Sequence, residues 1–390
     1  MRKHAGIFAI LLTISGLCGC GGDSNEPERM VYAHGIGFDY QGGQYVVYVQ
    51  FIDFSSMVGT SGGGLGGGSS SSSSSIVKAS GRTINQAVSN LYLLMDRHVY
   101  WGHLSFVLLS ERVIHHRGLK ESIDLINRNY STRYNILYYV AAGSDLEKYL
   151  TSVPINKIPI SMSKLSDPDN NYLQNSYVRP KSLRELILSL DEPNHQTELP
   201  LISLKERSGL HKGQTDTDYL GVVILSENDI QGKLICTDVY GLRWLYSGGV
   251  GRVRVILKDQ ERYLASVDVT GTKSRIVPAM DRTGKVRFTI DINVTAHVMT
   301  IIKPTHERTL ERLLETQVRR EIERTYRVSV NQHIDAFHFS EALYRSKYSA
   351  KWHRLQHNGK IDLDKLTLKK VEVHAYIKDS GKNNMMPTLD

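Results

Sequence analysis

The sequence predicts a chain of two halves, an α/β N-terminal half and an α+β C-terminal half, with mixed sheets flanked by helices. In the first half, short apolar strand patterns alternate with helical patterns, which is typical of a sheet that is at least partly parallel. In the second half, residues 286–298 alternate strictly between apolar and polar side chains, as in a long strand with one solvated face. The length of 390 residues suggests two or three domains.

The first half carries the signals of several short elements. Gln41-Gly42-Gly43 precedes the apolar run 45–51, which predicts a turn and then a strand. Thr83 and Gln86 match a capping box at the start of a helix. The apolar face of this helix consists of Ile84, Ala87, Val88, Leu91 and Met95. Further strands are expected at 104–109 and 136–141, and further helices at 118–127, 145–150 and 182–190.

The second half has a different rhythm. The strongest helix pattern spans residues 305–327, where Leu310, Leu314, Val318, Ile322 and Tyr326 stand four residues apart. Glu315 and Arg319 in this helix have the spacing and order of a favourable ion pair. Besides the long alternating run, strands are expected at 220–225, 234–237, 253–257 and 371–377.

Two stretches of the first half are predicted to lack regular structure. Residues 60–75 contain two glycine triplets and seven consecutive serines, a composition that buries too little apolar surface to offset its ordering entropy. We expect a flexible surface loop inserted within a domain. Residues 154–180 contain four prolines and a polar run, which indicates an irregular connecting region.

The N-terminus has the features of an export signal. Basic residues at the start precede an apolar run from Ala5 to Leu17, which is too short to span a bilayer. Leu17-Cys18-Gly19-Cys20 then resembles the bacterial lipobox, in which the last cysteine receives a diacylglyceryl group and becomes the new N-terminus. We therefore expect a lipoprotein signal peptide over 1–19, lipidation at Cys20 and a tether over 20–30. The alternative is an ordinary secretory signal with two incidental cysteines.

Lipidation would hold the chain on the outer face of a membrane, because two acyl chains bind where one is marginal. Of the three cysteines, only Cys236 then remains in the mature chain with a free thiol, so no disulfide can form within it. The net charge of +8 suits a position near anionic lipid head groups. The basic residues are scattered along the sequence, which argues against a nucleic-acid partner.

Histidines and acidic residues do not form a recognisable metal pattern. His115 and His116 are adjacent, and on a helix their rings would diverge. His353 and His357 would share a helical face, but no acidic or cysteine partner stands nearby, so solvated histidines are the simpler interpretation. Residues 216–218 (Asp-Thr-Asp) lack the glycine and glutamate of a calcium loop and are expected to form a polar turn.

Catalytic motifs are also not recognised. The sequence contains no Gly-x-Ser-x-Gly, and no Gly-Lys-Ser/Thr follows the glycines of the 60–75 loop. Cys236 lies in an apolar strand pattern, where a cysteine is usually an inert small hydrophobe. Trp101, Trp244 and Trp352 are expected in the core. We therefore expect neither an enzyme nor a bound metal or cofactor.

The order of short motifs along the chain resembles the C subunit of nutrient germinant receptors, the Ger(x)C family of spore germination lipoproteins. In the first half these motifs are Gly35-Ile36-Gly37-Phe38-Asp39, Gly81-x-Thr83 with Ala87, Gly102-His103-Leu104, Ser110-Glu111, Gly118 and Leu199-Pro200-Leu201-Ile202. In the second half they are Asp335-Ala336-Phe337-His338-Phe339, Tyr344, Trp352 and Ser380-Gly381. The chain departs from the family in lacking Trp-Asp after Cys20, in lacking a proline before Trp352, and in the inserted glycine/serine loop.

The resemblance implies an N-terminal family domain over 31–205 and a C-terminal family domain over 215–383. It also implies a non-catalytic receptor subunit that assembles with integral-membrane A and B type subunits in the inner membrane of a spore and responds to nutrients. The alternative function is a lipid-anchored extracytoplasmic solute-binding protein, usually built of two doubly wound lobes. A third class, a cell-wall hydrolase, would need a metal or carboxylate centre, and none is recognised in the sequence.

Overall fold

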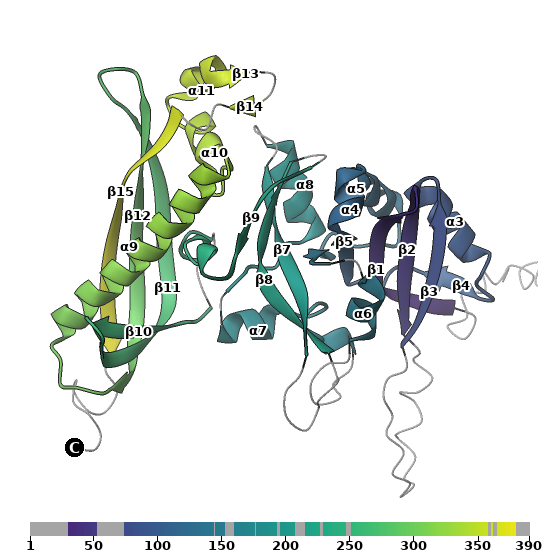
Figure 1. Ribbon diagram of the computed structural model, residues 1–390, viewed down its shortest axis with the longest axis horizontal. Coiled ribbons are helices and arrows are strands. Elements are labelled where there is room, and N and C mark those ends of the chain that lie inside the picture. The colour runs from purple at the N-terminus through teal and green to yellow at the C-terminus, as the bar shows by residue number, and fades with distance from the viewer. Residues whose placement is uncertain are drawn as a thin grey trace, which may run out of the picture.

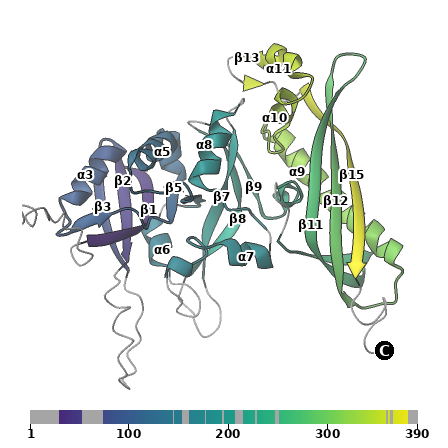
Figure 2. The ribbon, with the colours of Figure 1, turned by 180° about the vertical axis from the view of Figure 1, so that it is seen from behind.

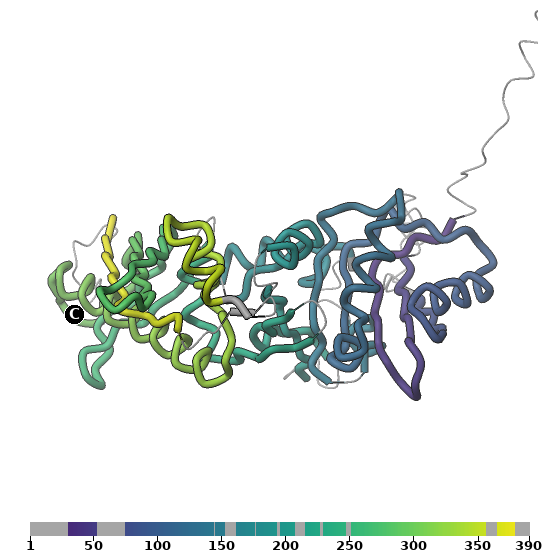
Figure 3. The backbone as a smooth tube through the Cα atoms, turned by 90° about the horizontal axis from the view of Figure 1, so that it is seen from above, coloured from purple at the N-terminus to yellow at the C-terminus, as the bar shows by residue number. Residues whose placement is uncertain are grey.

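The computed structural model describes residues 30–52, 74–143, 145–152, 160–175, 177–192, 196–206, 215–226, 229–246, 251–357, 360–361 and 365–379. They form an elongated body in which two sheets follow one another along the long axis (Figure 1). Seen from above, the two halves lie in line, with the first described strand in one half and the last strand at the far end of the other (Figure 3). The predicted fold class is confirmed.

The first sheet has nine strands and is mixed. Its order is β3-β2-β1-β5-β6-β7-β8-β9, and β4 pairs with the beginning of β1. The central strands β1, β5, β6 and β7 are parallel, whereas hairpins at both ends are antiparallel. The strands are β1 (Met30–Gln41), β2 (Gln44–Ile52), β3 (Ser74–Gly81), β4 (His98–Tyr100), β5 (Phe106–Ser110), β6 (Leu137–Ala141), β7 (Thr197–Glu206), β8 (Thr215–Leu225) and β9 (Ile230–Ile235).

Helices cover both faces of this sheet. One face packs against α3 (Ile84–Tyr92), α4 (Glu111–His115), α5 (Gly118–Arg128) and α8 (Leu183–Asp191). The other packs against α6 (Leu146–Thr151) and the segment that leads to α7 (Asp169–Gln174). At the start of α3, the Thr83 hydroxyl accepts the Gln86 amide as predicted, but the Gln86 side chain accepts from the Arg82 amide. The predicted capping box is therefore only half formed.

The second sheet has the order β10-β11-β12-β15 and is covered by the long helix α9. Of the five residues predicted to form the apolar stripe of this helix, Leu310, Leu314, Val318 and Ile322 are completely buried and Tyr326 is partly buried. The long strand β11 was not predicted, because its apolar alternation is short and much of its length is exposed. The elements are β10 (Val253–Asp259), β11 (Arg262–Met280), β12 (Val286–Ile301), α9 (Glu307–Asn331) and β15 (Leu366–Asp379).

Polar side chains of α9 bond to the backbone of β15, whose other edge pairs with β12. Glu315 accepts the Ala375 amide at 3.1 Å, and Glu311 accepts the Ile377 amide at 3.2 Å. Arg319 donates to the Val371 carbonyl at 3.2 Å. The predicted ion pair between Glu315 and Arg319 is therefore wrong, since both side chains satisfy backbone groups that an edge strand would otherwise leave open.

Strand β8 links the two halves. Val223 and Leu225 point into the core of the first half, whereas Val222 and Ile224 belong to the core of the second half. The sheet thus continues across the interval between the predicted domains 31–205 and 215–383, and these boundaries stay a prediction.

Several local predictions need correction. Residues 216–218 lie in β8 and form no turn, and Ser74 and Ser75 of the predicted loop belong to β3. Helix α11 (Ser349–Leu355) ends before His357, which lies in β13 (Gln356–His357), so His353 and His357 share no helical face. Cys236 is exposed, because β9 ends at Ile235 and Cys236 itself turns away with φ of 51°.

Cys20, the leader, most of the 60–75 loop and residues 153–159 lie outside the described residues. Within the part that is described, no helix combines the length and apolar character needed to cross a membrane.

Candidate functional site at the joint between the two sheets

The segment that follows α9 begins with a sharp reversal. The Ile334 amide donates to the Ser329 carbonyl, and His333 takes a left-handed conformation with φ of 53°. Such a hydrogen bond and such a left-handed residue are typical of a helix C-terminus that is capped by its own backbone. The reversal directs Asp335 and the residues after it into the space between the two halves.

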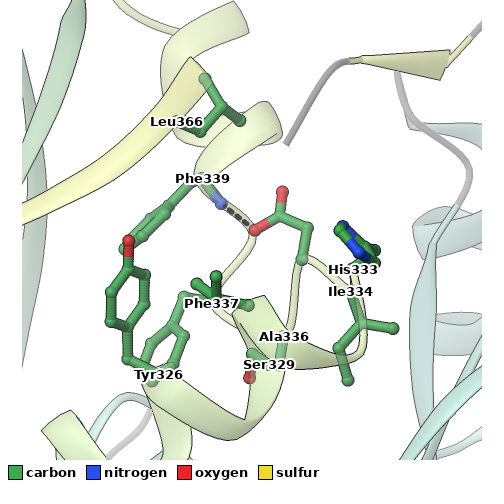
Figure 4. Close-up of a pocket in the computed structure, with 10 residues that line it drawn as sticks. Tyr326, Ser329, His333, Ile334, Ala336, Phe337, Phe339 and Leu366 are labelled. Carbon is green, nitrogen blue, oxygen red and sulfur yellow. Dashed lines mark hydrogen bonds between the residues drawn. The ribbon is translucent and has the colours of Figure 1, made fainter. Parts of the chain in front are cut away.

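Asp335 organises this segment. Its carboxylate accepts the Phe339 amide at 2.8 Å and the Ser340 amide at 2.7 Å, at the start of α10 (Phe339–Tyr344) (Figure 4). Burial raises the pKa of Asp335, while His338 and the two amide donors favour its ionised form. The side chain is therefore the local support of the turn between α9 and α10.

The aromatic residues of the same motif fasten the segment to the second sheet. Phe339 stacks on Phe288 of β12, with 4.3 Å between ring centroids, and on Phe337, with 5.6 Å. Tyr326 of α9 completes the cluster, which Figure 4 shows beside the turn. Trp352 donates its indole N–H to the Ser340 hydroxyl at 2.9 Å. The motif residues thus form one packed unit around α10.

His338, between the two phenylalanines, faces the other way. Its Nε2 lies 3.0 Å from Oε2 of Glu198 on β7, and the Lys181 ammonium lies 3.2 Å from the other oxygen. Burial opposes ionisation of Glu198, but Lys181 and His338 together lower its pKa. Burial likewise opposes protonation of His338, yet the bond to Glu198 raises its pKa. The two halves are therefore joined at the Glu198 carboxylate, which lies between the Lys181 ammonium and the His338 ring.

Two further contacts cross the same joint. The Asp335 amide donates to Oε1 of Gln196 at 3.3 Å. Arg345, just after α10, forms ion pairs with Glu192 and with Glu341. Glu198 directly precedes Leu199-Pro200, so the motif at the end of the first half and the motif of the second half meet here.

A cleft of about 660 Å³ opens beside this joint. Its walls come from both halves and combine charged side chains, which are largely paired with one another, with aromatic ones. The lining includes Arg179, Lys181, Glu185, Glu198, Tyr246, Phe337, His338 and Arg345.

The motifs of the first half support a second polar centre, around the buried Asp39. Its carboxylate accepts from Ser110 at 2.5 Å, from Gln41 at 2.6 Å and from two nitrogens of Arg112. Burial opposes ionisation, but these donors together lower the pKa of Asp39. Gly35 is required on the same strand, because a Cβ there would lie 2.4 Å from the Phe106 ring. This centre holds β1 against the start of α4.

A third polar centre, which sequence reasoning missed, lies in the core of the second half. Glu321 of α9 accepts from Arg243 at 2.9 Å and from the Trp244 indole at 2.8 Å. Thr325, one turn on, bonds to the Gly241 amide and the Asp238 carbonyl. A signal existed in the sequence. Gln317, Glu321, Thr325 and Ser329 form a polar row at a spacing of four, beside the apolar stripe of the same helix.

The histidines singled out in the sequence have separate surroundings. His115 bonds to Asp229 at 2.6 Å, His116 stacks on Tyr40, and His353 packs against Trp352. No group of three or more His, Cys, Asp or Glu side chains in the described residues is arranged to hold a metal ion. The three tryptophans are buried, as predicted.

Comparisons with known proteins agree with this arrangement of two halves. Residues 23–204 match the family model described as "Spore germination protein N-terminal domain", and residues 221–381 match "Spore germination B3/ GerAC like, C-terminal". The fold is similar to the crystal structure of the GerBC protein, with a TM-score of 0.54 and 14% identity over 88% of this chain and 96% of that one. The two family matches, in this order along the chain, define a two-part protein of the spore germination type.

Relatives of known sequence point the same way. The chain is 24% identical to spore germination protein KC of Bacillus subtilis, over 98% of this chain and 97% of that protein. It is 21% identical to spore germination protein B3 of the same organism, over 74% of this chain and 73% of that protein. The chain belongs to the Ger(x)C family of spore germination proteins.

Proposed function

We propose that this protein is a non-catalytic lipoprotein subunit of a spore nutrient germinant receptor, acting with integral-membrane A and B type subunits to trigger germination. The observation that carries the proposal is the match of both family domains, in order, along almost the whole chain. The names of the relatives support a role in spore germination.

The joint supports a scaffolding role in such a receptor. The family motif residues of the second half are used in packing, in capping α10 and in contacts to Glu198 and Gln196. Side chains engaged in this way fix the position of one half relative to the other. A subunit built in this way would hold its partner subunits in place or pass a movement from one to another. This role requires no reactive group at the joint.

Lipidation at Cys20 provides the attachment in this proposal. The leader and the Leu17-Cys18-Gly19-Cys20 sequence support processing to a lipid-bearing N-terminus on the outer face of a membrane, which in a spore is the inner membrane. The solute-binding alternative gains no support from the second half, whose described residues form a four-stranded sheet and a two-stranded one but no doubly wound lobe.

Deletion and complementation in spores test the proposal. Spores that lack this chain should lose the response to at least one nutrient, and the intact gene should restore it. A Cys20→Ala chain should be present at the normal level but leave the detergent phase and fail to restore the response. Normal germination of the deletion strain in every nutrient tested would overturn the receptor role.

A further inference from the structure

An exposed apolar pair marks the end of the molecule farthest from the second sheet. Leu93 and Leu94, here called the apolar tip, follow α3 and are 84% and 60% exposed. Two backbone bonds fix them, from the Leu94 amide to the Leu91 carbonyl and from the Met95 amide to the Tyr92 carbonyl. A folded surface rarely holds two adjacent leucines outward without a partner.

Tyr92 and Met95, the residues on either side of the apolar tip, line a cleft with tyrosine and arginine side chains. Tyr92 and Tyr130 line a shared cleft of about 430 Å³ together with Arg97, and Tyr130 is 98% exposed. The Trp101 indole donates to the Tyr92 hydroxyl at 3.0 Å, which fixes the base of the cleft. Exposed tyrosines beside apolar and basic side chains have the composition of a membrane–water interface.

Two arginines contribute positive charge at this end of the protein, Arg97 in the cleft and Arg133 near His103. Arg97 and Arg133 form no ion pair within the described residues. Asp124 is already paired with Arg128 at 2.8 Å, which leaves Asp96 as the acid next to the tip. Such a surface would be attracted to anionic head groups.

The position of the surface ties it to the tether. Strand β4 is part of the cleft and pairs with the first described residues, Met30 opposite His98. Figure 1 shows α3 and β4 at the outer end of the body, and Figure 2 shows α3 there from behind. The ten residues from Cys20 to Met30 span at most about 35 Å. A lipid on Cys20 would therefore keep this end of the protein within that distance of the bilayer.

We propose that the apolar tip and the surrounding tyrosines and arginines form a second membrane contact, which inserts into the interface of an anionic bilayer. This inference rests on the proposed lipid anchor. The leucines would enter the head group and acyl boundary, the tyrosines would lie at head group level, and Arg97 and Arg133 would meet lipid phosphates. The body would stand with its second sheet away from the membrane.

A fluorescent reporter at the tip tests the contact in the intact, lipidated chain. Leu93→Trp and the control Ile256→Trp, a 55% exposed position on β10 of the second sheet, would be bound to phosphatidylcholine–phosphatidylglycerol vesicles with brominated acyl chains. The emission of the Leu93→Trp protein should shift to the blue and be quenched, whereas the emission added by Ile256→Trp should not change. Equal behaviour of the two reporters would overturn the inference and would favour a protein partner for the tip.

A second measurement separates the contact from the anchor. The mature chain with Cys20→Ala should keep weak binding to the same vesicles, and Leu93→Ser with Leu94→Ser should weaken that binding at least about tenfold. The matched control, Ile256→Ser with Ile302→Ser, should leave it unchanged. Binding that is insensitive to the tip substitutions would overturn the inference and leave the anchor standing. A chain with intact Cys20 that partitions like Cys20→Ala would overturn the anchor, while tip-dependent binding would still support the contact.

Discussion

Each half of the molecule contains a buried carboxylate paired with an arginine, but the two pairs differ in their access to water. Asp39 in the first half is fully buried, while the side chain of its partner Arg112 is 45% exposed. Glu321 in the second half is buried together with Arg243, whose side chain is 8% exposed. If the acid is lost, Arg112 can turn into solvent, whereas Arg243 stays in the core. The comparison teaches that the cost of breaking such a pair depends on the partner left behind.

The largest effect is expected in the second half. Glu321→Ala should lower the free energy of unfolding by about 3–5 kcal/mol, because Arg243 and the Trp244 indole lose their buried acceptor. Urea unfolding followed by circular dichroism measures the loss. The control Glu323→Ala replaces an acid of the same helix that is exposed and should change little. A loss below about 1 kcal/mol for Glu321→Ala would contradict the argument.

A smaller effect is expected in the first half. Asp39→Asn keeps the shape and an acceptor for Ser110 but removes the charge, and should cost about 1–2 kcal/mol because Arg112 can be solvated. The pKa of Asp39 is lowered on folding, so its contribution is present above the unfolded pKa and is lost as the pH falls through the folded value. Acid titration of stability should therefore be less steep in Asp39→Asn than in the unaltered protein. If Asp39→Asn cost more than Glu321→Ala, the comparison would fail.

The joint should respond to pH in the opposite direction. The pKa of His338 is raised on folding, so its contribution is complete below the unfolded pKa and is lost as the pH rises through the folded value. Thermal melting should show a modest decline in Tm as the pH rises above the ordinary histidine pKa of 6.5. Glu198→Gln removes the partner and should flatten this dependence. An unchanged slope in Glu198→Gln would show that another group causes the decline.

The smallest effect is expected at the surface. Arg128 and Asp124 form an ion pair on α5 with both side chains mostly exposed. Arg128→Ala should change the free energy of unfolding by less than about 0.5 kcal/mol, and by less still at high salt. Chemical denaturation at two salt concentrations measures this. If Arg128→Ala lowered the free energy of unfolding as much as Asp39→Asn, solvent access of the ion pair would not determine the cost of breaking it.

Local patterns predicted more of this fold than of its joint. The apolar stripe of α9 and the alternation of β12 depend on neighbours within a few residues, so both could be recognised in the sequence. The motif resemblance pointed to His338, but its partner Glu198 is 140 residues away and no local pattern connects them. Cys236 was misplaced for a related reason, since its own backbone conformation, with φ of 51°, ends the strand at Ile235, two residues before the predicted end. The bonds from α9 side chains to the backbone of β15 likewise depend on the position of α9 over the sheet. The sequence of the helix alone does not predict this position.

Strand β8 has a mechanical consequence. Its alternate side chains pack into two different cores, so neither half can unfold without disrupting the packing of the other half. Heating should therefore melt the whole body in one cooperative step, and a force applied at the N-terminal end should be transmitted to the second sheet.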